Sequence, residues 1–336
     1  MKRIYASAIC ILIPVILQAK PALEIVLNSS QTTNPFGVAF DGKGTVYVAE
    51  YQGGRILHLN SEGKLRIFSG NGEKGFAGDG LDAGKAVYNG MHNVVRASNG
   101  DLYVSDTRNN LIRKIDGKTG LVSTIAGVPR QKGFSGDGGQ ATRAKLFDPI
   151  SISLSPDEKT LLIADIKNRR IRGVDLASGV IRTLAGNGDK GLPADGKQAT
   201  DQPLADPRAS ILDEEGNLYV LERGGNALRV VRPDGRIFTL AGTGRKGAKD
   251  GPGLKATFSG PKHLCMDGEG KIIIADDNNN LIRLYDPDTK KVSTILGGKA
   301  KPATKLNRPH GVAIAPDGGL WVCDSWNDRV VVLRNY

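Results

Sequence analysis

The chain has 336 residues, a length that fits one large all-β domain as well as two average domains. Its 44 glycines and 16 prolines, with only 5% aromatic residues, favour many short strands joined by tight turns. The formal net charge of +11 favours contact with anionic molecules without identifying one. The spacing of Cys265 and Cys323 excludes a cysteine metal site. Both are expected to act as small buried hydrophobes, with a disulfide between neighbouring repeats as the alternative.

The N-terminus has the three parts of a secretory signal peptide. Two basic residues precede an apolar run over residues 4–17, and small residues follow at Ala19 and Ala22. The run is too short and wrongly flanked for a good transmembrane span. We therefore expect residues 1–22 to be cleaved, leaving a mature domain of residues 23–336 with charge +8 and no membrane span, exported to the periplasm or secreted. An uncleaved N-terminal anchor is the alternative.

Six repeat units cover nearly all of the remaining chain. Each contains an apolar strand that ends on an acid, and successive acids are 48 to 59 residues apart. The acids are Glu50, Asp106, Asp165, Glu222, Asp276 and Asp324. Three positions later stand residues that tolerate the left-handed backbone of a tight turn, namely Gly53, Asn109, Asn168, Gly225, Asn279 and Asn327. Because an acid occurs in every unit, we expect a structural role, accepting turn amides or pairing with an arginine of the next strand.

A fourth strand closes units one to five, but the sixth unit ends before a fourth strand can form. The fourth strands are expected at residues 65–69, 122–126, 180–185, 237–241 and 292–296. A spare strand, Leu23–Leu27, lies at the other end of the mature chain. In a ring of units this strand would complete the sixth and protect the sheet edges. The sequence therefore predicts an all-β fold, a six-bladed β-propeller of four-stranded antiparallel blades, closed by an N-terminal strand that completes the last blade.

The pattern of an acid, an asparagine three positions later and a following basic or apolar strand resembles the NHL repeat. The resemblance is best seen in residues 275–283 and 323–330 and covers all six units, with Gly53 and Gly225 departing from the asparagine. It implies the propeller fold. It is less informative about function, because the family includes protein-binding, RNA-binding and catalytic propellers.

Functional residues are expected where the units differ. A Pro-x-Gly-like motif begins the first strand of each unit and is predicted to lie at the mouth of the central channel. Its middle residues are Phe36, His92, Ile150, Arg208, Lys262 and His310, and His263 follows Lys262. We expect His92, Arg208, Lys262, His263 and His310 to converge as candidate ligand-binding residues for an anionic or polyhydroxylated ligand. Alternatively, these side chains simply fill a wet channel.

The same motif bears on metals. The chain resembles gluconolactonase and senescence-marker propellers, which hold a divalent metal with Asn and Asp at this position, but here these oxygen ligands are missing. It resembles peptidyl-hydroxyglycine lyases more closely, whose alternating blades supply three zinc-binding histidines. Here those blades carry His92, Arg208 and His310, and arginine does not bind metal. We predict no cofactor and no metal site, with zinc or calcium as alternatives.

The connections between units carry a second pattern. Lys-Gly and Asp-Gly pairs recur in residues 74–80, 132–138, 190–196 and 246–251, whereas the fifth connection is shorter and purely basic. The Asp-x-Asp-x-Asp-Gly spacing of a calcium loop is absent. We expect turns with solvated Lys and Asp side chains, whose basic rim could serve as a contact surface.

These observations favour an exported monomeric binding module whose partner is an unknown protein, an anionic small molecule or a carbohydrate. The first alternative is a lyase or hydrolase that uses His92 and His310 at the channel mouth. A polyanion binder is the second alternative, although export and the lack of aromatic stacking residues on the loops disfavour nucleic acid. No nucleophile elbow, Walker loop, His-Glu-x-x-His or dinucleotide motif occurs in the sequence.

Overall fold

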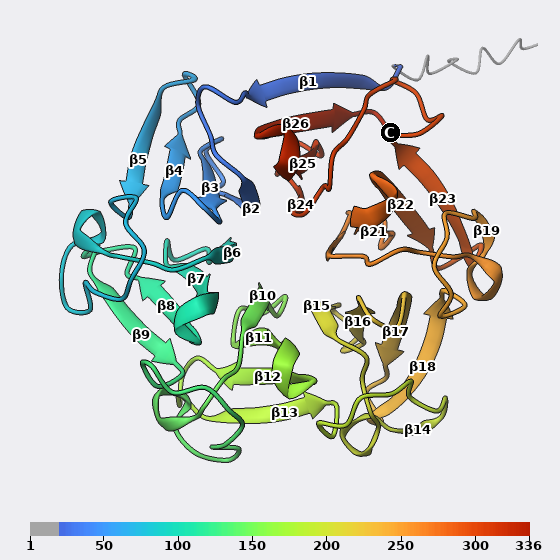
Figure 1. Cartoon of the computed structure of the whole chain (residues 1–336), viewed down its shortest axis with the longest axis horizontal. Coiled ribbons are helices and arrows are strands. Elements are labelled where there is room, and N and C mark those ends of the chain that lie inside the picture. The colour runs from blue at the N-terminus through green and yellow to red at the C-terminus, as the bar shows by residue number, and fades with distance from the viewer. Residues whose placement is uncertain (1–19) are drawn as a thin grey trace, which may run out of the picture.

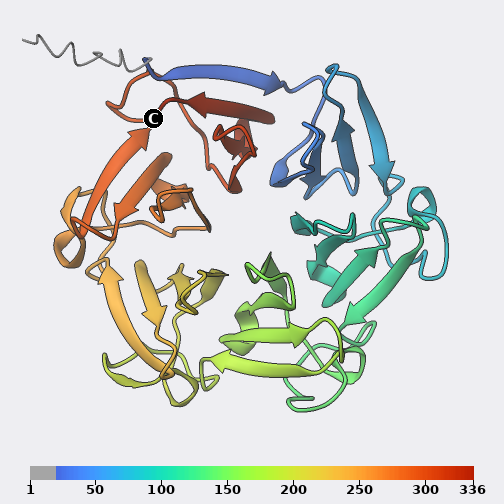
Figure 2. The ribbon, with the colours of Figure 1, turned by 180° about the vertical axis from the view of Figure 1, so that it is seen from behind.

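The protein is described by a computed structural model of residues 20–336. Six antiparallel sheets surround a central axis as the blades of a propeller (Figure 1; seen from behind in Figure 2). The predicted fold is therefore confirmed. The predicted signal peptide lies outside the described residues, apart from residues 20–22, and stays a prediction. Among residues 20–336, none of the helical segments has the length and apolar character needed to cross a membrane.

The four main strands of blades one to five run from the axis to the rim in chain order, whereas the outermost strand of blade six is β1. Blade one consists of β2 (Pro35–Phe40), β3 (Val46–Glu50), β4 (Ile56–Leu59) and β5 (Leu65–Ser69). Blade two consists of β6 (Met91–Arg96), β7 (Leu102–Asp106), β8 (Leu111–Ile115) and β9 (Val122–Ala126). Blade three consists of β10 (Pro149–Leu154), β11 (Thr160–Asp165), β12 (Arg170–Asp175) and β13 (Ile181–Ala185). Blade four consists of β15 (Pro207–Leu212), β16 (Leu218–Glu222), β17 (Ala227–Val231) and β18 (Arg236–Ala241). Blade five consists of β20 (His263–Met266), β21 (Ile272–Asp276), β22 (Leu281–Asp286) and β23 (Lys291–Leu296). Blade six consists of β24 (Val312–Ile314), β25 (Leu320–Asp324), β26 (Arg329–Arg334) and β1 (Ala22–Leu27). The fourth strands differ from the expected ones by at most one residue at their start.

Short 3-10 helices occupy the turns. Four follow the repeated acids: η2 (Thr107–Asn109), η4 (Ile166–Asn168), η7 (Asp277–Asn279) and η8 (Ser325–Asn327). Four lie in the connections between blades: η1 (Ala83–Lys85), η3 (Ala141–Arg143), η5 (Ala199–Asp201) and η6 (Gly253–Lys255). Two connections also add a short fifth strand to a sheet, β14 (Lys197–Gln198) in blade four and β19 (Gly251–Pro252) in blade five, which the sequence did not indicate.

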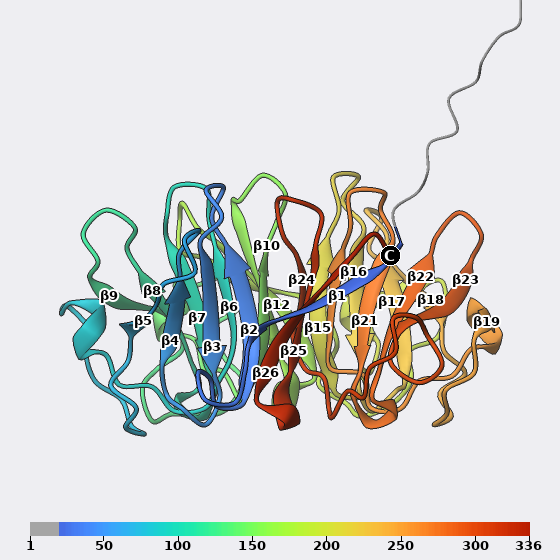
Figure 3. The same ribbon diagram turned by 90° about the horizontal axis from the view of Figure 1, so that it is seen from above.

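The N-terminal strand closes the ring as predicted. β1 pairs antiparallel with β26, from Ala22 opposite Arg334 to Leu27 opposite Val330. Figure 3 shows this strand crossing the outside of the last blade. Leu27 is completely buried and packs with Trp321 of its own blade and Val48 of blade one. The first residues of the domain therefore join its two ends.

The hydrophobic core is divided among the blade interfaces. Each of six apolar clusters combines side chains from two neighbouring blades, and the cluster around Tyr88 and Met91, for example, joins blades one and two. Cys323 is buried, Cys265 is half-buried, and both are unpaired. Because every blade packs on two neighbours, each needs the closed ring to bury both of its faces.

The six repeated acids are structural, as predicted. Their side chains are completely buried, and each accepts a backbone N–H from the segment that leads into its blade. In blade two, Asn89 N–H donates to Asp106 at 2.8 Å, and Arg113 lies 3.4 Å from the same carboxylate. Arginines also pair with the other five acids, from seven positions after the acid in blades three to five and from five positions after it in blades one and six. The acid thus joins two strands and the incoming chain in each blade.

The residue three positions after the acid does not have the predicted left-handed backbone. That conformation belongs to the fourth residue, such as Asn110 with a φ of 59°. Asn109 instead donates from its side-chain amide to Asp106 at 2.8 Å and to Gly75 O at 2.6 Å. The repeated asparagine therefore ties the buried acid to the Lys-Gly loop, and this is why the two motifs recur together.

In blades one and four, a glutamate and a glycine take the place of the Asp–Asn pair and fill the same space. Where the third position is glycine, the acid is glutamate, and a Cβ at Gly53 would lie 2.2 Å from Glu50 Oε2. We expect Gly53→Asn to lower the free energy of unfolding by about 2 kcal/mol because of this clash. Adding Glu50→Asp, which recreates the Asp–Asn pair, should recover most of the loss in a denaturant double-mutant cycle. Strictly additive effects of the two changes would contradict the interpretation.

The Asp-Gly loops are fixed to the following blade. Their aspartates are exposed, as expected, but they also contact side chains of that blade. Asp79 accepts from Thr124 Oγ1 at 2.7 Å and pairs with Arg113 at 2.7 Å. The same Arg–Thr–Asp contacts recur for Arg172, Thr183 and Asp137 and for Arg283, Thr294 and Asp250, while Asp195 binds Thr239 beside Arg229. We call this three-residue arrangement the latch. It holds a connection against the outer strand of blades two to five.

Candidate functional site

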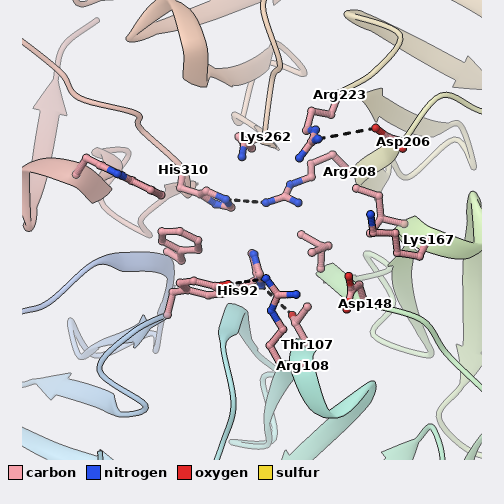
Figure 4. A pocket seen from close by; sticks show the side chains of 15 residues that line it. His92, Thr107, Arg108, Asp148, Lys167, Asp206, Arg208, Arg223, Lys262 and His310 are labelled. Atoms are coloured by element: carbon pink, nitrogen blue, oxygen red, sulfur yellow. Dashed lines mark hydrogen bonds and ion pairs between the residues drawn. The ribbon is translucent and has the colours of Figure 1, made fainter. Parts of the chain in front are cut away.

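The channel mouth forms a cavity of about 310 Å³ on the face that carries the turns after the repeated acids. All six middle residues of the Pro-x-Gly-like motifs line it, one from each blade (Figure 4). The first strands bring them together because each blade places its first strand at the axis. The predicted convergence of His92, Arg208, Lys262 and His310 is thus present, whereas ligand binding by them stays a prediction.

Arg208 is the cation at the centre of this cavity. Its side chain is only 4% exposed, and its Nη2 donates to His310 Nε2 at 2.8 Å. Among residues 20–336, no carboxylate lies within ion-pair distance of the guanidinium, and its Nε has no hydrogen-bond partner. Burial and the neighbouring Arg223 lower the pKa of Arg208 to about 9. A buried charge without an ion-pair partner is unfavourable, so binding of an anion beside Arg208 would be favourable.

Lys262 adds a second cation. Its side chain is 12% exposed and lies 3.9 Å from Asp277, whose carboxylate is held more closely by Arg308 at 2.7 Å. Burial, and then repulsion by Arg208, lowers the pKa of Lys262 to about 7. The lysine is therefore poised to gain or lose its charge near neutral pH.

The two histidines of the cavity are neutral. Burial, followed by repulsion from Arg208, lowers the pKa of both His92 and His310 well below the ordinary value. His310 accepts from Arg208 through Nε2 and so carries its proton on Nδ1. Neither histidine therefore contributes a charge to the cavity near neutral pH.

The tautomer of His92 follows from its neighbours. Thr107 donates its hydroxyl proton to Pro149 O at 2.6 Å, so His92 Nδ1–H must donate to Thr107 Oγ1 at 2.9 Å. Nε2 of His92 is left without a proton and without a partner in the described part of the chain. His92 Nε2 thus offers an acceptor to the cavity beside its cations.

Stacked aromatic rings form the opposite wall. Phe36 lies between the rings of Tyr51 and His310, with centroid distances of 4.6 and 3.9 Å. Trp326 continues the stack at 5.7 Å and is 48% exposed. Arg108 donates to the Tyr51 hydroxyl at 3.1 Å and fixes that ring. Aromatic side chains thus line one side of the cavity, opposite its cations.

His263 does not line the cavity. It stands one residue beyond Lys262, and strand alternation sends its side chain elsewhere. Its Nε2 lies 3.0 Å from the amide of Asn93, and its Nδ1 accepts from Val312 N–H at 3.4 Å. Burial lowers its pKa to about 4. His263 therefore joins blades two, five and six within the channel.

The cavity does not match the donor set of a three-histidine zinc site. The ring centres of His92 and His310 are 5.6 Å apart, and the third position is Arg208, which occupies Nε2 of His310. Across residues 20–336, no group of three or more His, Cys, Asp or Glu side chains is placed to hold a metal ion.

Several cavity residues were not predicted, because the prediction considered only residues of the first strands. The residue directly after each repeated acid also reaches the cavity in four blades: Tyr51, Thr107, Ile166 and Arg223. The next residue does so in three: Arg108, Lys167 and Trp326. These positions vary although the preceding acid repeats, and that contrast was a usable signal. Two acids, Asp148 and Asp206, also line the rim.

Fold and site together define a six-bladed β-propeller with a cationic cavity at one end of its channel. Residues 306–333 match the NHL repeat model. The chain is 30% identical over 275 residues to the Protein SUPPRESSOR OF QUENCHING 1, chloroplastic, of Arabidopsis thaliana, covering 78% of this chain and 26% of the relative. It is 27% identical over 345 residues to NHL repeat-containing protein 2 of Gallus gallus, covering 89% and 47%. The last blade thus contains an NHL repeat, and most of the chain is similar to NHL repeat-containing proteins.

The chain spans between about a quarter and a half of the length of these relatives. Among solved structures, a streptogramin B lyase superposes with a TM-score of 0.58 at 16% identity, covering 94% of this chain and 97% of the other. At that identity the likeness supports the fold alone.

Proposed function

We propose that this propeller is a binding module for a small organic anion, which it holds at the channel mouth through Arg208 and Lys262. The observation that carries the proposal is the buried Arg208 guanidinium, which forms no ion pair within 4.0 Å among the described residues; Asp277 and Asp206 act on it only from a greater distance. An anion bound there would remove the penalty of an uncompensated buried charge and gain charge-assisted hydrogen bonds. The cavity volume of about 310 Å³ suits a ligand of modest size.

The other walls narrow the class of ligand. Phe36, Tyr51 and Trp326 supply an aromatic wall, and His92 Nε2 supplies an acceptor. A planar carboxylate that also carries a hydrogen-bond donor would meet all of these groups. We further propose that the protein is exported, because its N-terminal sequence has the pattern of a secretory signal peptide.

Calorimetric titration with benzoate at pH 6 tests the proposal. The wild-type protein should bind benzoate, and Lys262→Met should bind it at least about tenfold more weakly because one charge-assisted hydrogen bond is lost. Arg182→Met, which removes an exposed arginine from β13, serves as the matched control and should bind like the wild type. Equal binding of small anions by the wild type and the Lys262 variant would contradict the assignment, and failure of the wild type to bind any of benzoate, acetate or phosphate would overturn it.

Binding should weaken as pH rises through 7. With its pKa lowered to about 7, Lys262 is charged below that pH and neutral above it. A bound anion favours the charged form, so the complex takes up a proton and affinity should fall by up to about tenfold per pH unit above the pKa. His92 and His310 are neutral throughout this range and do not contribute. The slope between pH 6 and 8, below the pKa of about 9 of Arg208, should vanish in Lys262→Met; its persistence would assign it to another group.

A lyase is the second candidate function, and the tautomer of His92 favours it. An unprotonated Nε2 beside two cations can remove a proton from a ligand whose anionic group they hold. A streptogramin B lyase also shares the fold. Conversion of a bound ligand by the wild type, with binding but no conversion by His92→Gln, would distinguish this function from binding alone.

A further inference from the structure

The outer edges of the six blades are not protected in the same way. In blades two to five, the preceding connection hydrogen-bonds to the outer strand. In blade two, Gly80 N–H donates to Val122 O at 2.8 Å and Val122 N–H to Leu81 O at 2.9 Å. Blade three is covered through Ile181, and blades four and five gain β14 and β19. These contacts occupy the backbone groups of an otherwise open strand.

Blades six and one lack this cover. Within residues 20–336, no backbone hydrogen bond from another segment reaches the outer edge of β1 or β5. The connections that would provide it are the shortened segment before β24 and the few residues between β1 and β2. β1 and β5 follow one another along the perimeter (Figure 1), so the two open edges are neighbours.

The latch is missing in the same two blades, and its residues are replaced by apolar ones. In blades two to five, the third-strand arginine lies opposite a threonine of the fourth strand, as Arg113 lies opposite Thr124. The corresponding pairs are Leu57 with Ile67 in blade one and Val331 with Ile25 in blade six. Both replacements are therefore confined to the uncovered edges.

These two isoleucines are unusually exposed. Ile67 is 51% and Ile25 is 55% exposed, although each stands in a strand of the sheet. An open strand edge with a large apolar side chain is the arrangement that binds an added strand. In the four covered blades, the threonine of the latch stands at the position of these isoleucines.

The surrounding charges indicate which strand fits. Lys64 and Arg66 flank Ile67, and both are exposed. Beside Ile25, Glu24 is exposed as well, but the connection before β24 carries exposed Lys299 and Lys301 and passes the beginning of β1 in two views (Figure 1, Figure 3), so basic residues outnumber it. A second copy of this chain would bring these like charges together, whereas an acidic segment would complement them.

We propose that β1 and β5 are docking edges for extended segments of a partner protein in which apolar and acidic residues alternate. Each segment would add a strand to its blade, with apolar side chains against Ile25 or Ile67 and carboxylates near the basic residues. This surface lies on the outer rim, so it is independent of the anion site at the channel mouth.

An octapeptide of alternating valine and glutamate is the probe, with a valine–lysine octapeptide and a proline-interrupted valine–glutamate octapeptide as controls. Fluorescence anisotropy should show binding of the first alone, and hydrogen exchange should slow at the amides of β1 or β5. Ile25→Thr with Ile67→Thr, which installs the residue used by the covered blades, should weaken binding by roughly tenfold or more. Leu121→Thr removes a 44% exposed apolar side chain beside a covered strand and should leave binding unchanged.

The double variant changes only exposed side chains, so its melting temperature and its benzoate affinity should match the wild type. No binding of the valine–glutamate peptide, equal binding of the valine–lysine peptide, or unchanged binding by the double variant would each overturn the proposal. So would a concentration-dependent dimer in sedimentation that the double variant abolishes, because the occupant would then be a second copy.

Discussion

Deleting residues 20–27, which removes β1, is expected to lower the free energy of unfolding by at least about 5 kcal/mol. Burial of Leu27 alone contributes about 1.5–3 kcal/mol, and β26, whose residues Val330 to Leu333 are completely buried, would become an exposed edge strand. Since domains of this kind have total stabilities of about 5–15 kcal/mol, most of the folding free energy is at stake. Denaturant unfolding followed by circular dichroism measures the loss.

A circular permutant is the matched control for this deletion. Ala22 pairs with Arg334, so a short turn after Tyr336 can lead directly into residues 20–27 at the new C-terminus. This chain would build blade six in the same strand order as the other five blades and should regain nearly the full stability. An unchanged midpoint in the deletion variant would show that β1 does not close the ring.

Replacing Arg208 by methionine is expected to make the ligand-free protein more stable and unable to bind the anion. Methionine has a similar length without the charge, so the penalty for burying an unpaired guanidinium disappears. The single hydrogen bond to His310 is lost, and the net gain should be about 1–3 kcal/mol. Such an exchange of stability for function is typical of binding sites.

Thermal unfolding and benzoate titration measure the two effects of Arg208→Met separately. Arg182→Met, at an exposed position, should change neither. A variant with lower stability and no binding would indicate that Arg208 is a packing residue. Retained affinity in a stable variant would remove Arg208 from the site.

The repeat pattern was enough to predict the propeller, because strand periodicity, the acid at each strand end and the displaced strand at Leu23–Leu27 all depend on local sequence. It also placed four of the five candidate residues at one cavity, since the first strand of every blade lies at the axis. The fifth, His263, was misplaced because the direction of a side chain depends on register, and a one-residue step reverses it.

The remaining contacts join segments that the repeat pattern does not connect. Asn109 binds a glycine carbonyl 34 residues away, and Arg113 pairs with Asp79 of the preceding connection. Their partners become visible only when blades are side by side. The same holds for Trp326, whose stacking against Phe36 needs the first and last blades to meet.

The most direct test of the anion site is a crystal structure of the mature protein soaked in sodium bromide, with the anomalous signal of bromine used to locate bound anions. We predict a strong peak in the cavity between the Arg208 guanidinium and the Lys262 ammonium at pH 6, absent from Arg208→Met crystals treated in the same way. Bromide on the outer surface with none at Arg208 would contradict the central claim.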